Sequence, residues 1–161
     1  MSVRKIYLLL AILTVALLTG CGDDGELLEY RKEVEEFYAK LEERDQAINA
    51  ISTDTQAASA ELLEELDKVN VAFQEFAALE VPRQYASVES LADEAAELMD
   101  EAVSQYHVAF SGETINELDA SLAYEKYSRA IHRINLIGDL FQGKDLEGEG
   151  ITVIYEDDPE E

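Results

Sequence analysis

The sequence predicts an all-α protein whose helices pack as an up-down-up-down four-helix bundle. Apolar residues recur at intervals of three and four in four segments, which is the pattern of a helix with one buried face. The composition also favours helix, because Ala, Leu and Glu are abundant while the chain has two Pro. Short breaks between the segments make successive helices antiparallel. We expect helices near residues 24–51, 54–79, 84–110 and 115–142.

The first helical segment carries two apolar series that are offset by three residues, as in the a and d positions of a heptad. One series runs through Leu27, Val34, Leu41 and Ile48. The other runs through Tyr30, Phe37 and Ile51, and Arg44 is its one polar member. The apolar stripes of all four segments are wider than a two-stranded seam needs, which favours a globular bundle over an extended coiled coil.

Residues that commonly cap or break helices separate the four segments. Residues 53–56 (Thr-Asp-Thr-Gln) and 114–117 (Thr-Ile-Asn-Glu) have the spacing of capping boxes. Pro82 disfavours helix in the residue before it, and Gly112 and Gly143 follow the third and fourth segments, where glycine often ends a helix. The main alternative is a three-helix bundle in which the first two segments form one long helix.

Charge and cysteine content exclude several classes of protein. The formal net charge is -24, from 36 acidic and 12 basic residues, so the surface would repel DNA and RNA. The chain has one Cys, which excludes an internal disulfide and a Cys-based zinc cluster. Most acidic residues lie off the apolar series, so they are expected to form a solvated coat.

The N-terminus has the organisation of an export signal. Arg4 and Lys5 precede an apolar run at residues 6–18 that is interrupted only by Thr14. A membrane-spanning helix needs about 20 apolar residues, so this run better suits the hydrophobic region of a signal peptide. The residues that follow, Leu18-Thr19-Gly20-Cys21, resemble the lipobox of bacterial lipoproteins. The alternative for Cys21 is a buried free thiol.

The lipoprotein resemblance implies a domain organisation and a location. Cys21 would carry the lipid after removal of a signal peptide at residues 1–20, and residues 21–25 would form a short tether. Residues 26–142 would form the helical bundle, and residues 143–161 a mostly disordered acidic tail. The protein would be extracytoplasmic and held to the cell membrane by its acyl chains. At up to about 3.6 Å per residue, the tether places the bundle within roughly 20 Å of the bilayer.

Three shorter stretches support a more specific resemblance. Residues 76–82 (FAALEVP), 91–95 (LADEA) and 123–130 (AYEKYSRA) are similar to segments of small helical lipoproteins of Firmicutes. The resemblance spans about residues 50–142. It implies a helical domain without an assigned activity, and it supplies no catalytic residues.

The two histidines do not form a predicted metal or catalytic site. Counting facing pairs in the antiparallel hairpin places His107 opposite Leu118 and His132 opposite Asp93, with roughly 20 Å between the histidines. Di-metal helical bundles use Glu-x-x-His, but the residues three before the histidines are Ser104 and Arg129. We therefore expect no catalytic, cofactor or metal site and no enzymatic activity.

Two side-chain sets on the later helices remain as candidate surfaces. Lys126, Arg129 and Arg133 have i, i+3 and i+7 spacing and form a candidate docking strip for an acidic group, such as the protein's own tail. The alternative is a solvated stripe with local ion pairs such as Glu125 with Arg129. The second set is expected to pack as one layer between helices, with its hydroxyls at the rim; it comprises Tyr85, Tyr106, Tyr124 and Tyr127.

The acidic tail contains a short strand-like run at residues 151–155 (ITVIY). A single strand is not stable alone, so the run either belongs to a disordered tail or pairs with the sheet edge of a partner.

The sequence as a whole favours a non-catalytic binding, adaptor or accessory component of the bacterial cell envelope. The expected partner is an envelope protein or polymer. The alternative is a lipoprotein that binds a small ligand or a divalent cation. The acidic side of the third helical segment is the basis of that alternative; it comprises Asp93, Glu94, Glu97, Asp100 and Glu101.

Overall fold

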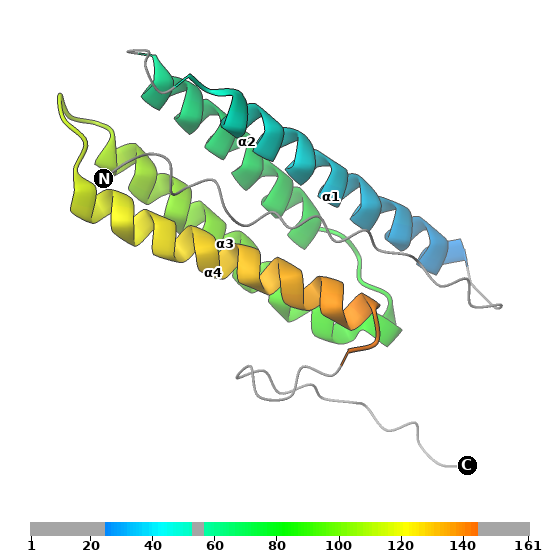
Figure 1. The fold of residues 1–161 in the computed structure, drawn as a ribbon. Coiled ribbons are helices and arrows are strands. Elements are labelled where there is room, and N and C mark those ends of the chain that lie inside the picture. The colour runs from blue at the N-terminus through cyan, green and yellow to red at the C-terminus, as the bar shows by residue number, and fades with distance from the viewer. Residues whose placement is uncertain (1–24, 53–56, 145–161) are drawn as a thin grey trace, which may run out of the picture.

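The computed structural model describes residues 25–52 and 57–144, which form four α-helices and a short 3-10 helix. The helices are α1 (Gly25–Ala50), α2 (Ala58–Ala77), α3 (Ala86–Ala109) and α4 (Glu117–Phe141), and η2 (Arg83–Tyr85) directly precedes α3. Successive helices run antiparallel (Figure 1), so the predicted all-α four-helix bundle is confirmed. The three-helix alternative is wrong, because α1 ends eight residues before α2 begins.

The helix ends differ from the sequence prediction in two instructive places. Helix α4 is capped by Asn116, whose side-chain oxygen accepts hydrogen bonds from the Leu118 and Asp119 amides at 3.2 and 3.3 Å. The predicted capping residue Thr114 lies two positions too early. Helix α3 ends at Ala109, before Gly112, whereas Gly143 has the positive φ of 69° that glycine accepts at a helix end. The other predicted capping box, residues 53–56, lies outside the described residues.

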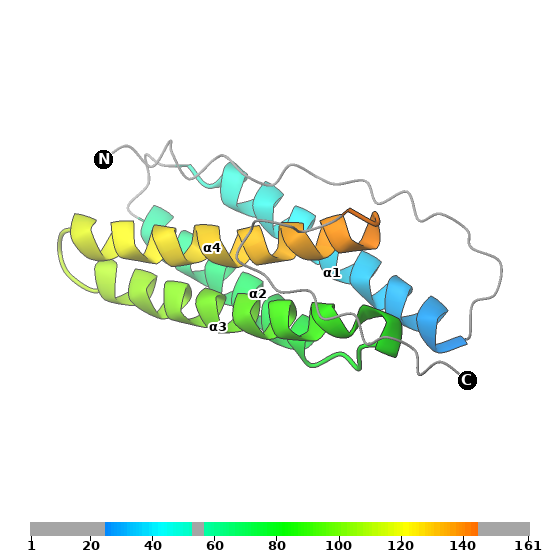
Figure 2. The ribbon, with the colours of Figure 1, turned by 90° about the horizontal axis from the view of Figure 1, so that it is seen from below.

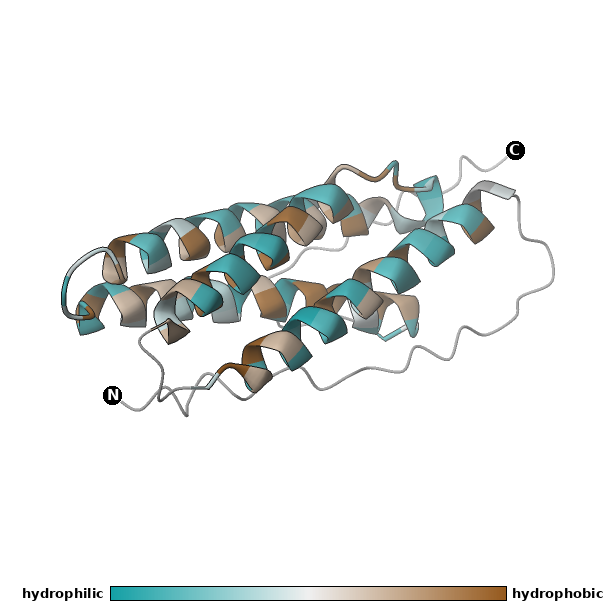
Figure 3. Ribbon diagram, turned by 90° about the horizontal axis from the view of Figure 1, so that it is seen from above, coloured by the Kyte–Doolittle hydropathy of each residue, from teal (hydrophilic) through white to brown (hydrophobic). Residues whose placement is uncertain are grey.

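The described interior is filled with apolar side chains from all four helices, and the hydrophobic and hydrophilic residues alternate along each helix (Figure 3). From α1, the buried members of the predicted seam are Leu27, Tyr30, Val34, Phe37 and Leu41. An aromatic cluster joins this helix to α2: the Phe37 ring stacks on Phe76 at 4.2 Å and meets Phe73 edge-on at 5.6 Å. The heptad pattern therefore marked the buried face of α1 correctly.

The four sides of the bundle are not equally tight. Helices α3 and α4 lie side by side along their length (Figures 1 and 2) and pack most closely, because small residues face each other. Those that are buried include Ala95, Ala102, Ala123 and Ala130. Within the described residues, no Cα of α1 lies within 8 Å of a Cα of α4. Large aromatic side chains span that side instead.

Two contacts of α1 show how this wide side is closed. The Tyr38 hydroxyl donates a hydrogen bond to the carbonyl oxygen of Ile134 in α4 at 3.1 Å. The Tyr30 ring lies 6.2 Å from the Phe141 ring, which also contacts Tyr85. Helix α1 therefore reaches α4 through tyrosine side chains, and its closest backbone neighbour is α2.

The two ends of the bundle differ in what they carry. The start of α1, η2 and the end of α4 lie together at one end (Figure 1), which we call the N-terminal end. The end of α1, the start of α2 and the α3–α4 connection lie at the other, which we call the hairpin end.

Candidate functional site

The basic strip of α4 is present on one side of the helix, but two of its three cations already have partners on α3. Lys126 Nζ lies 2.7 Å from Glu101 Oε2, and Arg133 Nε lies 2.7 Å from Glu94 Oε2. Arg129 lies between them and is exposed. The ion pairs of Lys126 and Arg133 thus connect α4 to α3. The alternative considered from the sequence was local pairing within α4. Two cations of the strip therefore link α4 to α3. The third, Arg129, is the most accessible.

The histidines lie on the surface and in separate environments. His107 Nε2 lies 2.8 Å from Asp67 Oδ1, so this α3 residue bridges to α2. His132 is exposed on α4. The sequence analysis paired residues only across the α3–α4 hairpin and so placed His107 opposite a residue of α4. It did not consider the side of α3 that faces α2. Among the described residues, no group of three His, Cys, Asp or Glu side chains could hold a metal ion.

The four tyrosines do not form the single layer that their spacing suggested. Tyr85 packs at the N-terminal end, with its ring 6.2 Å from Tyr30 and 4.8 Å from Phe141. Tyr106 contacts the Phe110 ring at 6.3 Å near the end of α3, and burial raises its pKa. Burial, then Asp45 and Tyr124, raise the pKa of Tyr127 to about 12. The tyrosines therefore belong to two aromatic clusters at different levels of the bundle.

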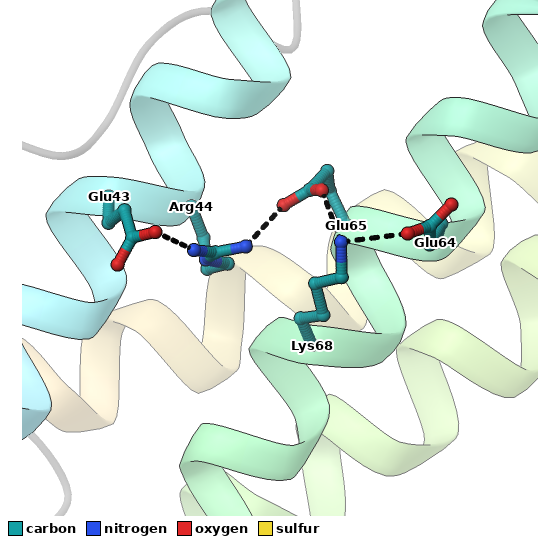
Figure 4. Close-up of polar contacts among 5 residues, drawn as sticks. All are labelled: Glu43, Arg44, Glu64, Glu65 and Lys68. Atoms are coloured by element: carbon teal, nitrogen blue, oxygen red, sulfur yellow. Dashed lines mark hydrogen bonds and ion pairs between the residues drawn. The ribbon is translucent and has the colours of Figure 1, made fainter.

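The one polar member of the α1 seam, Arg44, is the centre of an ion-pair network between α1 and α2 (Figure 4). Its guanidinium contacts Glu43 on its own helix and lies 3.0 Å from Glu65 on α2. Glu65 also accepts from Lys68 at 2.7 Å, and Lys68 in turn pairs with Glu64 at 2.8 Å. The hydrogen bond from Lys68 is the main reason that the pKa of Glu65 is lowered. Arg44 thus replaces an apolar contact by a charged one at the edge of the core.

A group of exposed apolar side chains at the hairpin end was not recognised in the sequence. Its members are between 44% and 69% exposed, and we call them the hairpin patch; they are Val108, Ile115, Leu118 and Leu122. Three of them have i, i+3 and i+7 spacing, the same signal that marks a buried helix face. That signal could have identified the patch, but it occurs just before the buried stripe of α4 begins at Ala123 and is easily read as part of it.

Polar contacts fix the backbone under the hairpin patch. The backbone N–H of Asn116 donates a hydrogen bond to the backbone carbonyl oxygen of Ala109 at 2.9 Å, which closes the α3–α4 connection. Beside it, Gln105 Nε2 donates to Asp119 Oδ1 at 2.7 Å and ties the two helices together. Val108 near the end of α3, Ile115 in the connection, and Leu118 and Leu122 at the start of α4 therefore belong to one hairpin.

The acidic residues on the outer side of α3 are all exposed, and several of them are used in contacts between helices. Asp100 accepts a hydrogen bond from Asn70 of α2 at 2.9 Å, while Glu94 and Glu101 pair with α4. Asp93 and Glu97 are exposed. These acids stabilise the bundle from outside and surround it with negative charge.

Other elements of the sequence prediction also lie outside the described residues: the signal peptide, Cys21 with its lipobox, and the acidic tail from residue 145 with its run at 151–155. Within the described helices, none combines the length and apolarity needed to cross a bilayer. Comparison of the chain with protein-family models, with curated proteins and with solved structures gave no match.

Proposed function

We propose that the protein is a lipid-anchored, extracytoplasmic component of the bacterial cell envelope that works by binding another envelope component. The observation that carries this proposal is the sequence Leu18-Thr19-Gly20-Cys21 directly after a short apolar run. Acyl chains contribute about 0.8 kcal/mol per buried CH₂, so a lipidated Cys21 would hold the chain firmly to a membrane.

The position of α1 supports a defined orientation for such an anchored bundle. Helix α1 begins at Gly25, four residues after Cys21, so the N-terminal end of the bundle would lie next to the membrane. A helix of 24 residues such as α3 is about 36 Å long at 1.5 Å per residue. The hairpin end would therefore project roughly that distance from the bilayer and be the part most accessible to a partner.

The distribution of side chains supports binding through the surface. The buried side chains of the described residues are hydrophobic, so the groups that can recognise a partner lie on the outside of the helices. The outside offers both acidic residues and the apolar hairpin patch. These are features of an adaptor that presents helix surfaces.

The anchor is tested by expressing the full chain in a bacterium that processes lipoproteins and labelling it with radioactive palmitate. We expect label in the wild type and in Thr14→Ala, which leaves the lipobox intact, and no label in Cys21→Ser. Mass spectrometry should find a mature chain that starts at Cys21 and carries a diacylglyceryl group. An unlabelled wild type, or one that keeps residues 1–20, would overturn the anchor.

The binding role is tested separately by photo-crosslinking in intact cells. A photo-reactive residue is placed at exposed positions on three helices, Val71, Ser104 and Ser121. We expect a discrete adduct from at least one position, and its loss when the anchor is removed by Cys21→Ser. Absence of an adduct at all positions would argue against an adaptor.

A further inference from the structure

We infer that the hairpin patch binds an amphipathic, basic helical segment of another protein. This inference rests on the proposed adaptor function and gives it a site and a class of partner. It combines three features of the hairpin end: exposed apolar side chains, an excess of acidic residues around them, and the i, i+4 spacing of two of them on α4.

The apolar side chains are too exposed and too close together to be scattered surface residues. Leu118 is 69% exposed, Val108 is 55% exposed, and Ile115 and Leu122 are nearly half exposed. Single exposed apolar residues are normal, but neighbouring ones from two elements of one hairpin mark an interaction surface. The Asn116–Ala109 and Gln105–Asp119 hydrogen bonds hold this surface in place without a partner.

The charge around the patch defines what can bind there. Residues 84–125 contain ten acidic residues and neither Lys nor Arg, and the first cation after them on α4, Lys126, is paired with Glu101 of α3. Glu113 and Glu125, which are close in sequence to the patch residues, are exposed. The excess of negative charge around the patch therefore favours a partner with positive charge at its rim. A second copy of this chain, at a net charge of -24, is repelled, and so is an anionic membrane.

The spacing of the apolar side chains favours a helix as the occupant. Leu118 and Leu122 lie one turn apart on the same side of the start of α4, about 6 Å along the helix at 1.5 Å per residue, and Ile115 lies in the connection just before them. A helix that lies along such a ridge contributes apolar residues at i, i+3 or i+4, and i+7. Lys and Arg on either side of that stripe would then face Glu113 and Glu125.

The test uses the full, lipidated protein in phosphatidylcholine nanodiscs, with empty nanodiscs as the blank. The probe is a fluorescent 18-residue helical peptide of Leu and Lys with an amphipathic pattern. Two control peptides have the same length: one has Glu in place of Lys, and the other has the same composition in a scrambled, non-amphipathic order. Binding is followed by fluorescence anisotropy as the protein is added.

The protein offers a matched control variant for the patch. Leu118→Ser with Leu122→Ser removes the centre of the patch, and Leu28→Ser changes a leucine of similar exposure (64%) on the first turn of α1, at the other end. We expect the double variant to bind the Leu/Lys peptide at least tenfold more weakly, and Leu28→Ser to stay within twofold of the wild type. Val108→Ser, on α3, should weaken binding independently. Circular dichroism confirms that each variant is folded.

Several outcomes would overturn the inference. Equal binding of the amphipathic and scrambled peptides, or unchanged binding by the Leu118/Leu122 variant, would show adhesion to the acidic coat alone. No binding by the wild type would also refute it. A dimer of the protein that dissociates in the Leu118/Leu122 variant would identify a second copy as the occupant. Because the peptide titration reports on the folded bundle and palmitate labelling reports on Cys21, failure of one is distinguishable from failure of the other.

Discussion

Glu65 pairs with two cations, Arg44 of α1 and Lys68 of α2. Protonation of Glu65 should therefore lower the stability of the folded protein. Its side chain is 15% exposed and accepts from both Arg44 and Lys68, so its pKa in the folded protein is lower than the usual 4.5. The unfolded chain therefore takes up the proton first as the pH falls. The stabilisation is complete above the unfolded pKa and is lost as the pH falls through the folded pKa.

This gives a prediction for the pH dependence of unfolding. We expect the urea concentration at the unfolding midpoint of the wild type to decrease as the pH is lowered from 6 to 3. The decrease should be smaller for Glu65→Gln, because this variant has no carboxylate at position 65 to take up a proton. Glu64→Gln is the matched control, since Glu64 also pairs with Lys68 but is 71% exposed. Its pH profile should follow the wild type. Parallel profiles for Glu65→Gln and the wild type would contradict the role of Glu65.

A second prediction concerns the aromatic cluster of the core. Phe73 is almost fully buried and meets the Phe37 ring edge-on. Replacing it with Ala leaves a large cavity and should lower the free energy of unfolding by about 3–5 kcal/mol. Val71→Ala, on the exposed side of the same helix, should change it by less than about 0.5 kcal/mol. Chemical denaturation of both variants measures the difference.

At the level of the helix, the start of α4 distinguishes the observed cap from the predicted one. Asn116→Ala removes the acceptor for two amides and should cost about 1 kcal/mol, while Asn116→Asp should retain most of the stability. Thr114→Ala should have little effect, because Asn116 already caps the helix. Thermal unfolding followed by circular dichroism compares the three variants. A larger loss of stability for Thr114→Ala than for Asn116→Ala would instead support the capping box that the sequence predicts.

The helices were predictable because their apolar spacing is regular and their breaks carry Pro, Gly and capping residues. The spacing identified Phe37 and Leu41 as buried and Arg44 as an interruption. It did not identify neighbours, because spacing fixes the side of a helix on which a residue lies but not the helix that it faces. That is why the contact of His107 with Asp67 was missed and why Tyr85 was grouped with tyrosines from the other end of the bundle.

The candidate surfaces were predictable only in part, for a similar reason. The basic strip was visible as a spacing, but the pairing of Lys126 and Arg133 with α3 depends on how closely α3 and α4 approach. The hairpin patch was missed because an apolar residue at helical spacing has the same pattern whether it is buried or exposed. Burial is a property of the whole molecule, and it separates Leu118 from Ile131.

At the scale of the whole molecule, the unequal packing of the four sides predicts unequal local stability. Helices α3 and α4 share the closest contact, whereas α1 meets α4 only through side chains such as Tyr38. Amide hydrogens in α1 should therefore exchange at least about tenfold faster than those in the centres of α3 and α4. Native-state hydrogen exchange measured by mass spectrometry tests this. Uniform protection of all helices would show that the bundle opens only as one unit.

The wide side between α1 and α4 also has a consequence for the order of folding during synthesis. The ribosome releases α1 first, but its lasting place in the bundle needs Tyr38 to reach the backbone of Ile134, almost a hundred residues later. The α3–α4 hairpin needs only a short loop closure and forms from local contacts. The first helix to be made is thus the last to find its complete set of neighbours, and until then its apolar seam is a natural target for a chaperone.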